Sequence, residues 1–160
     1  MPRVEESANS ETAYGDTEKL PFTPKCARHA ECSHSGMDEQ LDPVTSRIIG
    51  CAIQLHRFLG PGLLESVYQR GLAIEFTHAR IPFDSRRRIN ITYRGEKLGD
   101  FEPDFIVEDQ VVVEVKSASA HDRVFDAQVL TYLRLTGLRT GLLLNFGRPV
   151  LKDGLKRFAL

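Results

Sequence analysis

The chain has 160 residues, of which 41% are apolar and 27% charged, with a mean hydropathy of −0.26. This length and composition suit one globular domain and argue against a membrane protein, because no stretch approaches the roughly 18 uninterrupted apolar residues of a spanning helix. The start of the chain is polar and acidic, without an apolar secretion signal, and three cysteines are too few for a disulfide framework. We therefore expect a protein of the reducing cytoplasm.

Residues 1–43 differ in character from the remainder of the chain. They carry four basic and nine acidic side chains, a net charge of −5, whereas residues 44–160 carry 17 basic and 13 acidic side chains, a net charge of +4. The first segment is rich in Ser, Glu, Thr and Pro and has neither helical nor strand periodicity, so we predict a disordered acidic tail followed by one domain over 44–160. The positive charge of that domain is compatible with a nucleic-acid partner without requiring one.

The predicted tail contains one group of potential zinc ligands. Cys26, His29, Cys32 and His34 place two thiols and two imidazoles within nine residues. Their spacing matches no zinc module and no second ligand cluster follows, so incidental composition is the favoured interpretation and metal binding is the alternative.

Two amphipathic helices are predicted at the start of the domain. Asp42-Pro43 begins the first helix, whose apolar residues recur at helical spacing until Gly60-Pro61-Gly62 ends it. The second helix extends from about Leu63 to Ala79. On the first helix, His56 is predicted to be buried and hydrogen-bonded, and Cys51 to be a small core residue.

The pattern after the second helix changes from helical to alternating. It predicts two strands, a central strand that is apolar on both faces, a helix and a final apolar strand, at 88–93, 97–107, 111–116, 123–136 and 140–146. The resulting order, α-α-β-β-β-α-β, predicts an α/β fold with a mixed sheet flanked by helices.

Three ionisable residues interrupt the apolar strands. Glu114 and Lys116 point to one face of the central strand, and Asp104 lies in the strand before it. If residues 108–110 form a three-residue hairpin loop, Asp104 faces Glu114, and the repulsion between the two carboxylates is relieved best by a divalent cation such as Mg²⁺. A two-residue loop would separate the acids onto opposite faces. A structural ion pair between Glu114 and Lys116 is the alternative.

Further polar residues are candidates for the same site. Glu65 begins the second helix, where an acid is also favoured by the helix dipole. Gln128 and Tyr132 lie one turn apart on the third helix, where they line either the site or a solvated face. The basic residues Arg86, Arg87 and Arg88 form either a nucleic-acid-binding rim or a solvated charge run.

Several motifs resemble one known family. They are Gly62-Leu-Leu-Glu65-Ser-Val-Tyr68, Tyr93-Arg-Gly95, Asp104-Phe-Ile-Val107, Val113-Glu114-Val-Lys116, Ala127-Gln128-Val-Leu-Thr-Tyr132 and Gly141-Leu-Leu-Leu-Asn145-Phe146-Gly147. In this order, over about residues 44–158, the motifs resemble the GxxExxY family, which is similar to the PD-(D/E)XK nuclease superfamily. The resemblance implies a restriction-endonuclease-like fold with an α-β-β-β-α-β core.

The resemblance also implies a role for each matching residue. Asp104, Glu114 and the Val115 carbonyl are the implied metal ligands, with Glu65 as a helix-borne acid that assists. Lys116 is implied to position or activate the attacking water. Gln128 is implied to line the site through its amide.

The sequence therefore predicts a nuclease that depends on Mg²⁺ or Mn²⁺ and cleaves nucleic acid, DNA in particular, with a metal-activated water. One alternative is a catalytically silent module that keeps the fold and binds nucleic acid or protein. Others are a toxin or defence component that needs a protein partner, and a small-molecule hydrolase with a deep apolar pocket. A homodimer or an unidentified protein partner is compatible with each of these.

Overall fold

Asp42 caps the first helix of the part of the chain that the structure describes. The structure is a computed structural model that describes residues 42–160. Helix α1 (Pro43–Leu59) begins where the Asp42 carboxylate accepts the Thr45 N–H at 2.9 Å. It ends at Gly60, whose φ of 69° suits a residue without a Cβ. Helix α2 (Glu65–His78) follows, so both predicted helices are confirmed. The Cys26–His34 group and nearly all of the predicted tail lie outside the described residues.

A five-stranded mixed sheet forms the centre of the domain, with the order β1-β4-β5-β6-β7. β5 and β6 are parallel and are joined through α3, whereas the other neighbours are antiparallel. The strands are β1 (Phe83–Ser85), β4 (Phe105–Val107), β5 (Val111–Lys116), β6 (Thr140–Asn145) and β7 (Leu155–Ala159), and the connecting helices are α3 (Arg123–Thr136) and the 3₁₀-helix η1 (Leu151–Gly154).

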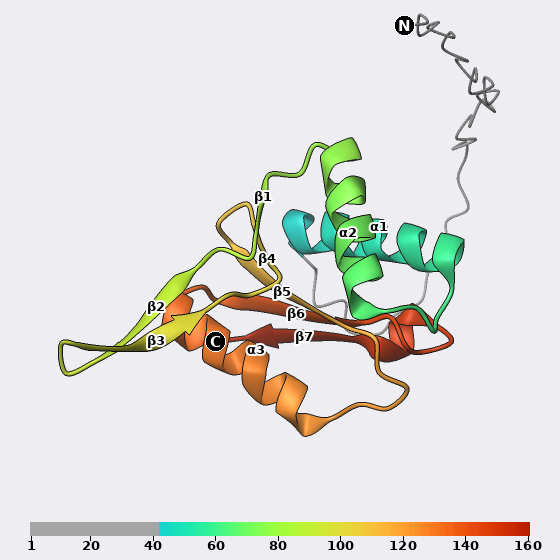
Figure 1. Cartoon of the computed structure of the whole chain (residues 1–160). Coiled ribbons are helices and arrows are strands. Elements are labelled where there is room, and N and C mark those ends of the chain that lie inside the picture. Colours follow the sequence, from blue (N-terminus) through green and yellow to red (C-terminus); the bar gives the residue numbers. More distant parts are fainter. Residues whose placement is uncertain (1–41) are drawn as a thin grey trace, which may run out of the picture. The chain divides into compact units, whose positions relative to one another are not determined.

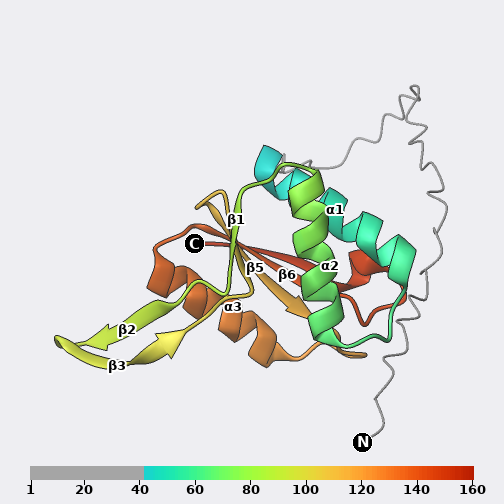
Figure 2. The ribbon, with the colours of Figure 1, turned by 45° about the horizontal axis from the view of Figure 1, so that its top comes forward.

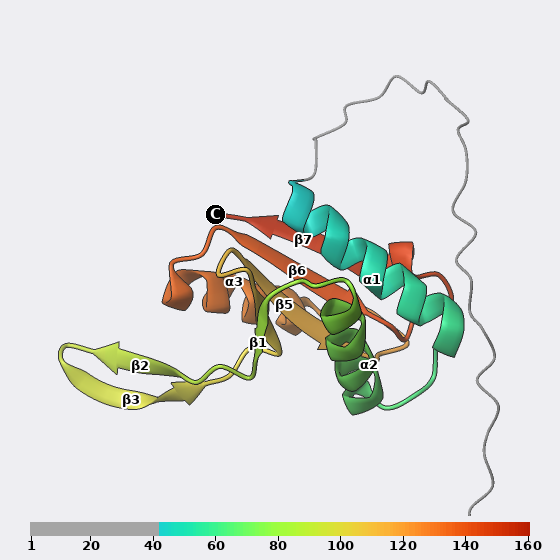
Figure 3. The same ribbon diagram turned by 90° about the horizontal axis from the view of Figure 1, so that it is seen from above.

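The helices cover the sheet from both sides, with α1 and α2 on one face and α3 on the other (Figures 1 and 3). Because successive strand residues point to opposite faces, Val113 packs toward α1 and α2, and Val112 toward α3. This arrangement confirms the predicted mixed sheet flanked by helices. None of the helices within residues 42–160 has the length and apolar character needed to cross a bilayer.

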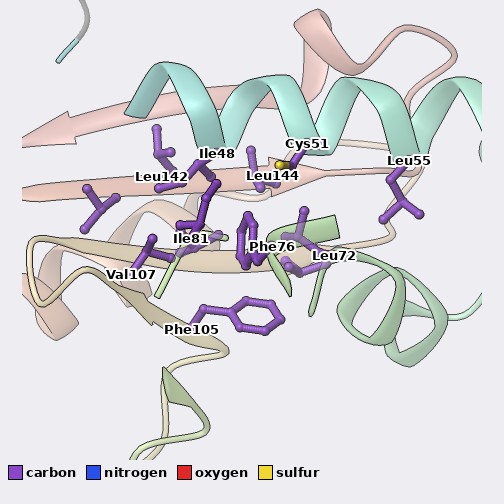
Figure 4. Packing of buried hydrophobic residues seen from close by; sticks show 14 of the residues in the cluster. Ile48, Cys51, Leu55, Leu72, Phe76, Ile81, Phe105, Val107, Leu142 and Leu144 are labelled. Atoms are coloured by element: carbon purple, nitrogen blue, oxygen red, sulfur yellow. The ribbon is translucent and has the colours of Figure 1, made fainter. Parts of the chain in front are cut away.

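The larger core lies between the sheet and the α1–α2 layer. Figure 4 shows Cys51 of α1 and Phe76 of α2 beside side chains of β6 such as Leu144. Cys51 is buried there, as predicted. His56 is also buried, and its Nε2 lies 2.9 Å from the Arg148 carbonyl oxygen, which confirms a hydrogen-bonded histidine.

The prediction of one long strand over 97–107 is wrong. β2 (Ile89–Tyr93) and β3 (Glu96–Phe101) form a separate two-stranded sheet, which extends away from the central sheet (Figures 1 and 2). Residues 102–104 separate β3 from β4, and Pro103 among them has no N–H to donate to a strand partner. The chain therefore leaves one sheet and enters the other within three residues. The sequence pattern also gave no indication of the short strand β1 or of β7.

We expect Gly141→Ala to destabilise the domain. A Cβ at Gly141 would lie 2.6 Å from Val129 Cγ1 and 3.2 Å from Leu133 Cδ1, because α3 packs directly on β6 here. Overpacking of this kind reduces the free energy of unfolding by about 1–3 kcal/mol, which chemical denaturation measures. The control is Gly99→Ala in β3, whose Cβ would meet nothing within 4 Å. Equal losses for the two variants would contradict the close packing of α3.

Candidate active site

The loop of residues 108–110 sets the register of β4 against β5. Phe105 lies opposite Val113, so the loop has three residues, which is the case in which Asp104 and Glu114 are expected to share a face. Asp104 directly precedes β4, and its Oδ2 accepts a hydrogen bond from the Val115 N–H at 2.8 Å. The Asp104 carboxylate is thereby held against the end of β5.

Glu114 and Lys116 of β5 form a close pair. Glu114 Oε1 lies 2.6 Å from Lys116 Nζ, and only 4% of the Glu114 side chain is exposed. The second carboxylate oxygen, Oε2, is buried and has no hydrogen-bond partner among the described residues. The ion pair with Lys116 therefore gives one oxygen of the Glu114 carboxylate a partner and leaves the other oxygen without one.

The N-terminal end of α2 lies against the end of β5. Ser117 Oγ donates a hydrogen bond to the Leu63 carbonyl at 2.6 Å. In the first turn of α2, Glu65 Oε1 lies 3.9 Å from Lys116 Nζ. Glu65 thus adds a carboxylate to the group formed by Asp104, Glu114 and Lys116, and we call these four residues the acid–lysine cluster.

Gln69 belongs to the same site but was not among the predicted residues. Its Nε2 donates to Asp104 Oδ1 at 2.8 Å and lies 3.4 Å from Glu65 Oε1. Residues four apart on a helix share a face, so the spacing from Glu65 was the signal that could have identified it.

Helix α3 contributes an amide and a phenol. Gln128 Nε2 donates to Tyr132 Oη at 2.6 Å, and the Tyr132 ring stacks on Phe101 with centroids 4.8 Å apart. Burial raises the pKa of the Tyr132 phenol, and the negative charge of Glu114 adds to the shift. The phenol is therefore within electrostatic range of the acid–lysine cluster.

The three consecutive arginines have different surroundings. Arg87 pairs with Asp109 at 2.7 Å, and Arg88 pairs with Glu102 at 3.1 Å. The Arg86 guanidinium instead donates to Gln69 Oε1 of α2 at 3.2 Å, within the site. The structure therefore brings Arg86 to the candidate site and keeps its two neighbours in surface ion pairs.

A buried amide fixes the segment that follows Lys116. Asn145 Oδ1 accepts the Ala118 N–H, and Asn145 Nδ2 donates to the Ala118 carbonyl, both at 2.9 Å. At Gly147 a Cβ would lie 2.4 Å from the same carbonyl oxygen, so this close approach requires glycine. Asn145 and Gly147 thus hold the end of β5 and its side chains in place.

The electrostatics of the cluster disfavour three ionised acids. Burial, followed by the negative charge of Asp104, raises the pKa of the Glu114 carboxyl to about 7 although Lys116 opposes the shift. Burial also raises the pKa values of Asp104 and Glu65. For Lys116, burial lowers the pKa, but the Glu114 carboxylate outweighs it, so the pKa of the ammonium rises. The site therefore attracts cations.

A family model for the PD-(D/E)XK nuclease superfamily matches residues 42–158, almost all of the described chain. The chain belongs to the PD-(D/E)XK nuclease superfamily. Comparisons with curated proteins and with solved structures gave no match. Membership agrees with the observed mixed sheet between helices, which is a restriction-endonuclease-like fold. The finer resemblance to the GxxExxY family stays a prediction.

The superfamily's sequence pattern has its counterpart in the acid–lysine cluster. Pro103-Asp104 supplies the proline and first acid, and Glu114-Val115-Lys116 supplies the second acid and the lysine. In this PD-(D/E)XK domain the two segments meet because β4 and β5 are hairpin partners. The catalytic roles of these residues remain predictions.

Members of the superfamily generally use divalent metals, and the candidate site contains oxygen donors that such metals prefer. Residues 42–160 contain no group of three or more His, Cys, Asp or Glu side chains placed to hold a metal ion. Mg²⁺, however, is commonly bound through one or two carboxylates together with water. Glu114 has a buried, unpartnered Oε2, and it lies near enough to Asp104 for the two carboxylates to repel each other, so this pair fits such a two-carboxylate site. The Val115 carbonyl remains a predicted further ligand, whereas Glu65 is not placed to act as a third carboxylate ligand and remains the predicted acid that assists.

Proposed function

We propose that this protein is a nuclease that depends on a divalent metal, Mg²⁺ or Mn²⁺, and hydrolyses phosphodiester bonds, those of DNA in particular. The observation that supports this most directly is the Glu114 carboxylate, which is buried beside Asp104 with one oxygen unpartnered. A buried carboxylate in this state is unfavourable in a purely structural role. A buried carboxylate with an unpartnered oxygen is expected where a bound cation takes the place of the missing partner.

Asp104 and Glu114 would hold the cation, with the Val115 carbonyl as a further ligand and Glu65 as a nearby acid that assists through its negative charge. When bound, a divalent cation stabilises negative charge on the phosphate oxygens and lowers the pKa of a bound water. Lys116 supplies the ammonium of the cluster. Its position 2.6 Å from Glu114 allows it to donate to the attacking water or to a phosphate oxygen.

The reaction is the hydrolysis of a phosphodiester. The water oxygen forms a bond to phosphorus, the bond to one sugar oxygen breaks, and that oxygen takes up a proton. Gln128 and Tyr132 present an amide and a phenol that bind and orient the strand at the α3 side. Arg86 provides a guanidinium for a neighbouring phosphate.

Two of the alternatives differ in what they require of the structure. A small-molecule hydrolase needs a deep pocket at the reactive groups. Cavities of about 460 and 410 Å³ are present, but they are lined by residues of α1, α2, the turn at Gly60-Pro61 and the 149–152 segment, and no member of the acid–lysine cluster lines them. A silent binding module would bind nucleic acid without needing the cation, and the experiment below separates it from an enzyme.

The test is cleavage together with cation binding. The purified protein is expected to nick supercoiled plasmid DNA with Mg²⁺ or Mn²⁺ and to stop when EDTA is added. Asp104→Asn should lose cleavage and most of its calorimetric affinity for Mg²⁺, because it removes the charge of one of the two carboxylate ligands.

Asp109→Asn is the matched control, because it changes an exposed carboxylate in the hairpin loop at a φ of 53°, which asparagine tolerates. It should cleave and bind Mg²⁺ as the wild type does. Equal cleavage by the wild type and Asp104→Asn would identify a contaminant, and metal-independent DNA binding without cleavage would support the silent module instead.

A further inference from the structure

The Gln69 side chain connects three charged residues of the site. Its Nε2 donates to Asp104 Oδ1 at 2.8 Å and lies 3.4 Å from Glu65 Oε1, and its Oε1 accepts from Arg86 Nη2 at 3.2 Å. The opposite amide orientation would direct the oxygen at two carboxylates and the NH₂ group at a guanidinium. The surrounding charges therefore determine which way this amide lies.

Gln69 also determines the orientation of the Asp104 carboxylate. Each oxygen of Asp104 accepts one hydrogen bond, Oδ2 from the Val115 N–H and Oδ1 from Gln69. Because a carboxylate oxygen has two acceptor positions, both oxygens keep a free position for a cation. Without Gln69 the carboxylate would be held at one oxygen only and could rotate.

Arg86 is anchored so that its guanidinium reaches this network. It directly follows β1 with a φ of 52°, and its backbone N–H donates to the Asp104 carbonyl at 3.1 Å. The segment that carries Arg86 is thereby tied to the segment that carries Asp104. In the described part of the chain, Arg86 forms no ion pair with a carboxylate at 4 Å or less, unlike Arg87 and Arg88. Its remaining N–H groups are therefore available to an anion.

We propose that Gln69 is a positioning residue that orients the Asp104 carboxylate and couples it to Arg86, and that Arg86 contacts a phosphate of the nucleic-acid strand bound at this site. The proposal rests on the proposed nuclease function and deepens it by assigning one residue to the cation side and one to the substrate side. Substitution of Gln69 should therefore reduce the affinity for Mg²⁺, and substitution of Arg86 should reduce the affinity for DNA.

Gln69→Leu tests the cation side. It keeps the size of the side chain but removes the hydrogen bond to Asp104, so Mg²⁺ affinity by calorimetry should fall about 10–100-fold, and kcat should fall with it. Gln54→Leu, on an exposed position of α1, is the matched control and should change neither. Thermal unfolding shows whether the variant is folded. Wild-type Mg²⁺ affinity in folded Gln69→Leu would overturn this assignment.

Arg86→Ala tests the substrate side, with Arg88→Ala as its control. DNA affinity is measured by fluorescence anisotropy in Ca²⁺, which allows binding to be followed separately from turnover. Arg86→Ala should weaken binding and reduce the slope of log affinity against log salt by about one, while Mg²⁺ affinity is not weakened. Arg88→Ala should change the slope by less. Identical behaviour of the two variants would overturn the phosphate contact.

The double variant tests the coupling between the two residues. If Gln69 orients the Arg86 guanidinium, the loss of DNA affinity in Gln69→Leu/Arg86→Ala should be smaller than the product of the two single losses. A wild-type protein that binds neither Mg²⁺ nor DNA would contradict the proposed nuclease function itself. A wild type that binds both, with Gln69→Leu and Arg86→Ala indistinguishable from their controls, would contradict this inference alone.

Discussion

Lys116→Met should lose nucleolytic activity by about 10²–10⁴-fold while it keeps its affinity for Mg²⁺. Lys116 is the ammonium of a cluster that contains three carboxylates, and its Nζ lies 2.6 Å from Glu114 Oε1. Removing it takes away the donor that we assign to the water or the phosphate. It does not remove a carboxylate, and the lost positive charge makes the site more attractive to a cation.

This result would separate the roles of the lysine and the acids. Asp104→Asn is expected to lose both cleavage and cation binding, whereas Lys116→Met is expected to lose cleavage alone. Single-turnover cleavage and calorimetry on the same preparations provide the comparison. Lys156→Met is the control, because Lys156 is an exposed lysine of β7 paired with Asp126, outside the cluster. A Lys116→Met protein with wild-type cleavage would exclude the assigned role, and one that also fails to bind Mg²⁺ would point to a purely structural lysine.

The sequence reduced the question of whether Asp104 and Glu114 meet to one local determinant, the length of the loop at residues 108–110. A loop of three residues between two apolar strands fixes their register, and register decides which side chains share a face. The pairing of Phe105 with Val113 confirms that step. The helices were also predictable, since proline, glycine and the Asp42 cap mark their ends.

The parts that the sequence did not predict depend on tertiary contacts. β1 has three residues, too few to show a period, and it becomes a strand by pairing with β4. Residues 97–107 have the composition of one strand, but Pro103 and the change of sheet divide them. Gln69 is an ordinary polar helix residue until Asp104, which is 35 positions away in sequence, lies beside it. Likewise, three adjacent arginines look equivalent until their partners are known.

In the absence of divalent metal, the domain should lose stability as the pH rises from about 5 to 8. The folded-state pKa of Glu114, about 7, lies above its ordinary value of 4.5, mainly because the carboxylate is buried and then because Asp104 is near. Between these two values the folded protein retains a proton that the unfolded chain has released, so stability falls with pH and the loss is complete above pH 7. At about 1.4 kcal/mol per pKa unit, the shift corresponds to roughly 3 kcal/mol of unfolding free energy. The raised pKa values of Asp104 and Glu65 act in the same direction.

Glu114→Gln isolates this contribution, because glutamine keeps an acceptor for Lys116 and carries no charge to desolvate. In EDTA at pH 8 the variant should be more stable than the wild type by chemical denaturation, and at pH 5 the two should be similar. Glu96→Gln, at the exposed tip of the β2–β3 hairpin, should leave the pH profile unchanged. Mg²⁺ should restore the wild type at pH 8, since a ligand of the folded state stabilises it, and should not stabilise Glu114→Gln to the same extent. A wild type as stable at pH 8 as at pH 5 would mean that the Glu114 carboxylate is fully compensated by the protein itself. The site would then have no electrostatic need for a cation.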